Sequence, residues 1–237
     1  MNTTLILATL RQRLTNPIRL GLLALLFFMP IGAATLMYQN GLATLGDSYG
    51  LTLVLAAGLI GQDLSSGVLQ LLFARPVRRS EYLINRWLAV SFGVTALSLV
   101  QAVVAVGLLG MRGHPTSAQE FMIFAGNSAL IAFGTAAVVA LFSSLLPGFG
   151  DLALLLVFQL VGGVLQMVGQ FAARPLVSRI GTEMTGFITP RFDLTPFFAG
   201  VDPSWAAIAA YASTVTLSLA LAIVVLNRRE LSYASAG

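Results

Sequence analysis

The segment Gln62–Trp87 reads QDLSSGVLQLLFARPVRRSEYLINRW, and it is a long polar insert on the Arg-rich side of an otherwise apolar chain. Asp63 ends one apolar run, and Gly67 opens a Leu-rich turn. Arginines on both sides of Pro76 follow, and Glu81 leads into the next apolar run. A segment of this kind lies at the membrane surface and presents a short amphipathic helix to a molecule outside the bilayer. It predicts a membrane protein that works with a soluble partner.

The composition of the rest of the chain excludes a soluble domain. Of its 237 residues, 57% are hydrophobic and 9% are charged, and the mean hydropathy is +0.88. A soluble domain has roughly a quarter charged residues. Each bilayer span takes about 20 apolar residues, and only helices or closed barrels can cross. Because the apolar runs are continuous rather than alternating, we expect an all-α polytopic membrane protein.

The chain contains no cysteine and no lysine, and its thirteen basic residues are all arginine. The absence of Cys excludes disulfides, thiol nucleophiles and thiolate metal sites. The absence of Lys excludes a phosphate-binding loop, so any ATP that drives this protein is bound by another chain. We therefore expect no catalytic residue, metal or cofactor here. The isoelectric point near 10.1 does not predict nucleic-acid binding, because the arginines lie scattered along span boundaries.

The apolar runs predict six membrane spans. They are Ile18–Tyr38, Ser48–Gly61, Trp87–Gly110, Phe121–Leu146, Asp151–Phe171 and Trp205–Leu226. Asn16-Pro17 is a good helix start for the first span, because Asn caps helices and Pro suits their first turn. The second span is the weakest prediction, since its strictly apolar run is short, and we expect it to continue through Gln62 to Leu64.

The arginines predict the orientation. With the N-terminus inside, nine lie on the inner side: Arg11, Arg13, Arg19, Arg75, Arg78, Arg79, Arg86, Arg228 and Arg229. Four lie outside: Arg112, Arg174, Arg179 and Arg191. This distribution agrees with the positive-inside rule, and it would vanish or reverse if the second span did not cross. We expect a multi-pass protein of the bacterial cytoplasmic (inner) membrane with both termini in the cytoplasm.

The chain is expected to be a single transmembrane domain, residues 1–237. Residues 1–16 are predicted to form an interfacial helix; a cleaved signal peptide is the alternative, but the following apolar run is too long for a typical signal core. Residues 172–204 form a long outer loop in which we expect short helices at the membrane interface.

The polar segment resembles the signature of the type-2 ATP-binding-cassette (ABC) transporter permeases. In that family an acidic residue is followed by Gly-Thr-Leu-Glu-Leu-Leu, then Arg-Pro-Val, an Arg and a helix that re-enters the membrane. Here Asp63 precedes GVLQLLFARPVRRSEYL at Gly67–Leu83, with Val68 and Gln70 in place of the usual Thr and Glu. The motif matches closely and the whole chain loosely.

The resemblance implies that residues 62–86 form a cytoplasmic coupling loop, whose short helix inserts into a groove of a separate ATPase subunit. It also implies two ATPase copies that bind ATP and Mg²⁺, and a second permease chain in a homodimer or heterodimer. The coupling residues would be Asp63, Gly67, Val68, Leu71, Leu72, Arg75, Pro76, Arg78, Arg79, Glu81 and Tyr82. The alternative reading of the same segment is an ordinary Arg-rich inner loop held by anionic membrane lipids.

A second group of polar residues lies on the fifth span. Gln159, Gly163, Gln166 and Gln170 fall at i, i+4, i+7 and i+11, on one helical face. Amides are costly against lipid, so this face meets protein or water. This face either lines a substrate pathway or forms hydrogen bonds to another helix around a small-residue contact at Gly162-Gly163.

Ionisable residues are absent from the middle of the predicted spans, which disfavours proton- or ion-coupled transport. Together with this, the resemblance to type-2 ABC permeases leads us to expect the membrane-spanning permease subunit of an ATP-driven transporter, and the export direction is what the resemblance alone implies. A non-transporting membrane anchor or assembly scaffold remains the alternative. A membrane-embedded enzyme is nearly excluded, because the chain lacks a nucleophile with a base and lacks a metal cluster.

Overall fold

The computed structural model describes residues 3–65, 78–202 and 204–228, and the regular structure in those ranges is helical. The elements are α1 (Thr3–Leu14), α2 (Pro17–Leu36), the 3₁₀ helix η1 (Tyr38–Leu45), α3 (Tyr49–Ala56), α4 (Gly61–Ser65), α6 (Arg79–Met111), α7 (Ala118–Leu145), α8 (Gly150–Phe171), α9 (Pro175–Ile188), α10 (Thr195–Phe198) and α11 (Trp205–Arg228).

Six helical segments among the described residues are long and apolar enough to cross a membrane. They are Pro17–Leu36, Gly41–Ser65, Arg79–Met111, Ala118–Leu145, Gly150–Phe171 and Trp205–Arg228. The predicted number and order of spans are confirmed. So is the predicted start of the first span: the side chain of Asn16 accepts hydrogen bonds from the backbone N–H of Ile18 and of Arg19, at 3.0 and 3.3 Å.

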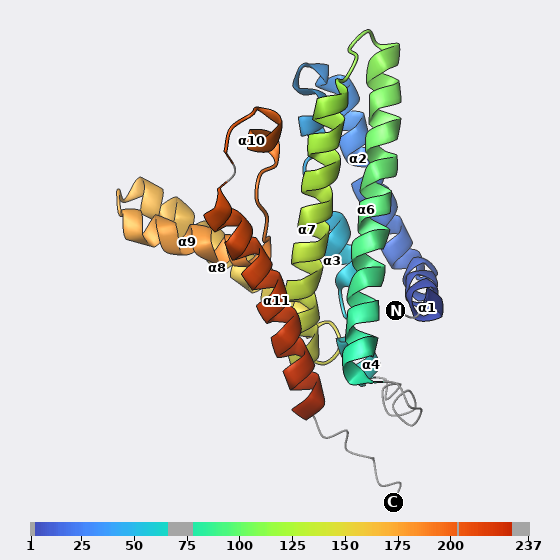
Figure 1. Ribbon diagram of the computed structural model, residues 1–237, viewed down its shortest axis with the longest axis vertical. Coiled ribbons are helices and arrows are strands. Elements are labelled where there is room, and N and C mark those ends of the chain that lie inside the picture. Colours follow the sequence, from blue (N-terminus) through green and yellow to red (C-terminus); the bar gives the residue numbers. More distant parts are fainter. Residues whose placement is uncertain (1–2, 66–77, 203, 229–237) are drawn as a thin grey trace, which may run out of the picture.

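Helix α7 lies at the centre of the bundle, between α6 and α11 in Figure 1, with α3 also packed against it. Its buried residues are mostly small, which lets neighbouring helices approach closely; they include Ala132, Gly134, Ala136, Ala137 and Ala140. Two hydrogen bonds to its carbonyls fix the neighbours. Trp87 Nε1 of α6 donates to Phe133 O at 3.0 Å, and the Tyr211 hydroxyl of α11 donates to Leu130 O at 2.9 Å.

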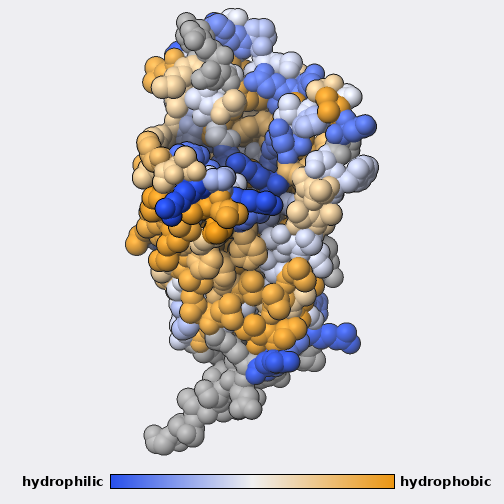
Figure 2. All heavy atoms as spheres, turned by 90° about the vertical axis from the view of Figure 1, so that its left-hand side faces the viewer, coloured by the Kyte–Doolittle hydropathy of each residue, from blue (hydrophilic) through white to orange (hydrophobic). Residues whose placement is uncertain are grey.

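The outer helices leave apolar side chains exposed. In α11 only 11% of the most apolar stretch is buried, against 78% in α7. Figure 2 shows the side of the molecule that is on the left in Figure 1. Hydrophobic residues form a band across it, with hydrophilic residues above the band and at its lower edge. An apolar belt between polar ends is the surface of a protein solvated by lipid, so the chain is a multi-pass membrane protein.

Helices α8 and α9 form a hairpin that projects from one side of the bundle (Figure 1). Glycines make the close contact between them: a Cβ at Gly162 would lie 2.9 Å from Thr185 Cγ2, and one at Gly181 would lie 2.5 Å from the backbone nitrogen of Gln166. The expected short helices in residues 172–204 are present as α9 and α10.

The second span is not the single helix that the sequence predicts. It consists of η1, α3 and α4, with a break between Ala56 and Gly61 where Gly58 has φ +64°. The span does continue beyond Gly61, to Ser65. The lower part of the span is held as irregular backbone inside the protein, which a membrane tolerates only where other residues satisfy the peptide groups.

Candidate functional site

At the break in the second span, two arginines of other helices donate hydrogen bonds to backbone carbonyls. Arg13 of α1 donates to Leu55 O at 3.0 Å, to Ala57 O at 2.6 Å and to Gly58 O at 2.9 Å. Arg19 of α2 donates to Ala57 O at 3.0 Å and to the side-chain oxygen of Gln62 at 2.9 Å. These carbonyls would be unpaired in a plain helix break, and charged donors form the stronger hydrogen bonds.

Arg13 is 2% exposed and remains charged in this setting. Burial, together with the nearby cations Arg19 and Arg86, lowers the pKa of its guanidinium to about 9, which still leaves it protonated at neutral pH. Two carboxylates in the same region, Asp63 and Asp151, balance part of this positive charge.

The amide donors of the break are satisfied from the end of α7 and the start of α8. The N–H of Gly58 donates to Asp151 Oδ2 at 2.7 Å. The hydroxyl oxygen of Ser143 accepts from the N–H groups of Ile60 and Gly61, both at 2.9 Å. The break is therefore a defined structure joined to four other helices, and its geometry depends on all of them.

Asp63 joins the two ends of the polar segment. It lies in α4, and its carboxylate accepts from the hydroxyl of Tyr82 and pairs with the guanidinium of Arg86, both in the first turns of α6. Arg86 also donates to Gln12 Oε1 of α1 at 3.3 Å and stacks over the Tyr82 ring. We call Gln12, Asp63, Tyr82 and Arg86 the base cluster, because it joins the described residues that precede and follow residues 66–77.

The predicted coupling residues are placed in part. Asp63 and Tyr82 are buried in the base cluster, whereas Arg78 and Glu81 are exposed at the start of α6. Arg79 donates to the carbonyls of Leu226 and Asn227 at 2.7 and 3.2 Å, at the end of α11. The remaining predicted residues, Gly67, Val68, Leu71, Leu72, Arg75 and Pro76, lie outside the described residues.

The predicted amide face of α8 points away from the bundle. Gln159, Gly163 and Gln170 are exposed and Gln166 is half-buried. Within the described part of the chain, the three Gln side chains accept and donate no hydrogen bond. Gly162 meets α9, but nothing lies within 4 Å of a Cβ at Gly163. Within this one chain, the Gln side chains of this face therefore form no hydrogen bonds to other described helices.

Five residues at the break in the second span were not predicted from the sequence as functional. They are Arg13, Arg19, Gln62, Ser143 and Asp151. The charged residues at the inner ends of the spans could have indicated this region. Two acidic residues at span ends on the Arg-rich side need partners, and two arginines of the N-terminal region were available to share the same interior.

Comparison with protein-family models, with curated proteins and with solved structures found no match to this chain.

Proposed function

We propose that this chain is the membrane-spanning permease subunit of an ATP-driven ABC exporter, whose ATPase is a separate subunit that binds ATP and Mg²⁺. It resides in the bacterial cytoplasmic membrane with both termini in the cytoplasm. It performs no catalysis itself; it converts movement of the bound ATPase into movement of the spans.

The observation that carries the proposal is the base cluster. Because Asp63 is bound to Tyr82 and Arg86, the two flanks of residues 66–77 are joined and would move together. The same flanks connect to α1 through Gln12, and the adjoining break connects to α8 through Asp151. A force applied to the segment would thus reach several spans. A loop held only by lipid headgroups would need no such buried base.

The exposed amide face of α8 supports the second permease chain. Gln159 and Gln170 are exposed on α8, which is long and apolar enough to cross a membrane, and unpaired amides in lipid cost free energy. A second chain, or a water-filled path between two chains, would satisfy them.

The test is co-expression of this chain with an ATPase of the phosphate-binding-loop type encoded beside its gene. The unmodified chain should co-purify with that ATPase, and Leu72→Asp should abolish co-purification while the permease still inserts. A buried Leu contributes about 1.5–3 kcal/mol, and an added charge costs more. Leu72→Met, which keeps the volume and the apolar character, should retain the ATPase. If the unmodified chain recovers no ATPase, the proposal fails, and the anchor reading takes its place.

A further inference from the structure

A cavity of about 610 Å³ lies at the end of the bundle opposite the base cluster, the upper end in Figure 1. Three segments far apart in the sequence line it: η1 with the turn at Gly46-Asp47, the part of α7 from Glu120 to Ile131, and residues 191–193. We call it the upper pocket. Its volume lies in the range of about 300–1,000 Å³ typical of small-molecule sites.

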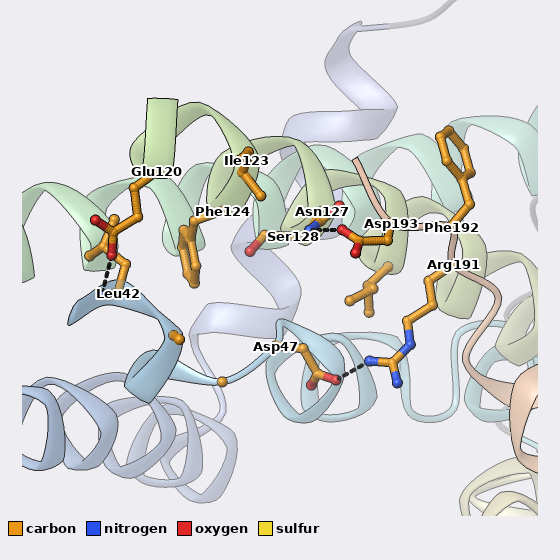
Figure 3. Close-up of a pocket in the computed structure, with 13 residues that line it drawn as sticks. Leu42, Asp47, Glu120, Ile123, Phe124, Asn127, Ser128, Arg191, Phe192 and Asp193 are labelled. Atoms are coloured by element: carbon orange, nitrogen blue, oxygen red, sulfur yellow. Dashed lines mark hydrogen bonds and ion pairs between the residues drawn. The ribbon is translucent and has the colours of Figure 1, made fainter. Parts of the chain in front are cut away.

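The charges of the upper pocket are unbalanced. Asp47, Glu120 and Asp193 supply three carboxylates, and Arg191 supplies the one guanidinium among the lining residues. Figure 3 shows these carboxylates placed around the cavity, with Arg191 directed at Asp47. That pair is loose, with 3.4 Å between Arg191 NH1 and Asp47 Oδ2, and both side chains are largely exposed. The net charge of the lining therefore favours a cation.

Several hydrogen-bond acceptors of the pocket have no donor among the described residues. Glu120 uses Oε1 to accept from Leu42 N at 2.9 Å, and Asp193 uses Oδ1 to accept from Thr195 N at 2.9 Å. Among the described residues, the second oxygen of each has no hydrogen-bond partner. The hydrogen bonds of Thr195 also lower the pKa of the Asp193 carboxyl, which keeps it ionised.

Ser128 is the deepest polar group of the pocket. It is 3% exposed, and its carbonyl accepts from the Ser48 hydroxyl at 2.7 Å. Its own hydroxyl has no partner among the described residues, although it lies on the cavity wall. This hydroxyl oxygen is available to accept a hydrogen bond from a ligand donor in the pocket.

Apart from Asn127, the rest of the lining is apolar. Phe124 projects from α7 between Glu120 and Ser128 (Figure 3), and Leu42, Ile123 and Ile131 complete the wall. An aromatic face beside a cation adds to binding. Among the residues that the structure describes, no group of three or more His, Cys, Asp or Glu side chains is placed to hold a metal ion.

We propose that the upper pocket binds an organic ammonium ion with an apolar body. The carboxylates of Asp47, Glu120 and Asp193 would attract the positive charge, and the hydroxyl of Ser128 would accept from one ammonium N–H group, while Phe124 and its apolar neighbours would enclose the body. An ammonium group has three donors and no acceptor, which matches a wall of unused acceptors. This inference needs no ATPase partner, so it stands or falls separately from the proposed function.

The test uses the full chain in nanodiscs of zwitterionic lipid and two probes of nearly the same shape. 4-Phenylbutylamine is protonated at neutral pH, and 4-phenylbutanol is uncharged. Calorimetric titration should show the amine binding more tightly than the alcohol. Empty nanodiscs correct for partition into lipid. Equal affinities for the two probes would overturn the proposal.

Charge variants of opposite sign then locate the site. Asp47→Asn keeps the acceptor used by Tyr49 N but removes one charge, and it should weaken amine binding by up to about fivefold, as for a partly exposed ion pair. Arg191→Gln removes the competing cation and should tighten binding by a similar factor. General damage to the pocket would weaken binding in both variants, and that result would contradict the proposal.

Two further variants complete the set. Ser128→Ala should weaken the amine about fivefold, as expected for one lost hydrogen bond, and should leave alcohol binding nearly unchanged. Asp202→Asn, at an exposed acidic residue that does not line the cavity, should change neither affinity. An effect of Asp202→Asn equal to that of Asp47→Asn would show that surface charge, rather than the pocket, attracts the amine.

Discussion

The backbone N–H of Gly58 donates a 2.7 Å hydrogen bond to Asp151 Oδ2, which ties the break in the second span to the first turn of α8. The two residues are 93 positions apart in the sequence. Because Arg13 binds the carbonyl of Ala57, which belongs to the same peptide unit as the N–H of Gly58, that unit is held from α1 and from α8. The break is thus a junction between the N-terminal helices and the helix that carries the exposed amide face.

Close backbone packing at this junction leads to the first prediction. A Cβ at Gly61 would lie 2.5 Å from Gly148 O and 2.8 Å from Leu146 O, and both are backbone atoms that cannot rotate away. Gly61→Ala should therefore destabilise the protein by roughly 1–3 kcal/mol, as other overpacked sites do. Thermal unfolding of the purified chain in detergent measures the change.

Gly21→Ala is the matched control, because Gly21 lies within α2 with nothing within 4 Å of a Cβ. It should be neutral or stabilise by about 0.5–1 kcal/mol, the usual gain over a helical Gly. Equal melting temperatures for the two variants would contradict the described junction.

The base cluster gives the second prediction. Asp63→Leu leaves Arg86 buried without its carboxylate, and breaking a buried ion pair from one side costs about 3–5 kcal/mol. We expect a large fall in the unfolding temperature. The double variant Asp63→Leu with Arg86→Met removes both charges and should recover much of the loss, since apolar replacements of a whole pair are often tolerated.

The double variant also separates stability from coupling. If the base cluster transmits movement, the double variant should keep its fold and its bound ATPase but lose the stimulation of ATP hydrolysis by substrate. Full stimulation in a well-folded double variant would show that the cluster is only structural.

The spans were predictable because each is a continuous apolar run bounded by polar residues, and Asn16-Pro17 marks a helix start on local grounds alone. The break at Ala57–Ile60 was not predictable, because Gly58 stands in a run as apolar as the helix before it. What makes irregular backbone possible there is Arg13, Arg19, Ser143 and Asp151, which approach from distant parts of the chain.

The upper pocket escaped prediction for the same reason. Asp47 and Arg191 are 144 residues apart, and neither has a local pattern that indicates the other. The base cluster was predicted in part, since Asp63 and Tyr82 belong to one motif, but the sequence does not indicate that they bind each other.

The third prediction concerns orientation. The chain has no Cys, so single Cys substitutions report accessibility directly. Cys at Gly113 or at Thr182 should react with an impermeant maleimide in intact cells, whereas Cys at Arg78 or at Ser235 should react only after the membrane is opened. The arginine distribution gives the reason. Reaction at position 78 in intact cells would overturn the six-span orientation.

The last prediction tests the amide face of α8. In the single chain Gly163 is exposed, and nothing lies within 4 Å of a Cβ there. Gly163→Leu should therefore leave the fold and the melting temperature of the chain nearly unchanged. If a second permease chain packs on this face, however, the Leu side chain fills space that the partner backbone occupies, and close helix contacts in membranes depend on small residues.

We expect Gly163→Leu to convert the assembled permease pair into single chains, measured by mass photometry in nanodiscs and by cross-linking in membranes. Gly107→Leu is the matched control, because Gly107 is also exposed on a spanning helix, α6, with nothing within 4 Å of a Cβ. It should leave the pair intact, since a Leu that faces lipid costs little. Pairs that survive Gly163→Leu would place the partner on another face and leave the three amides of α8 to a water-filled path.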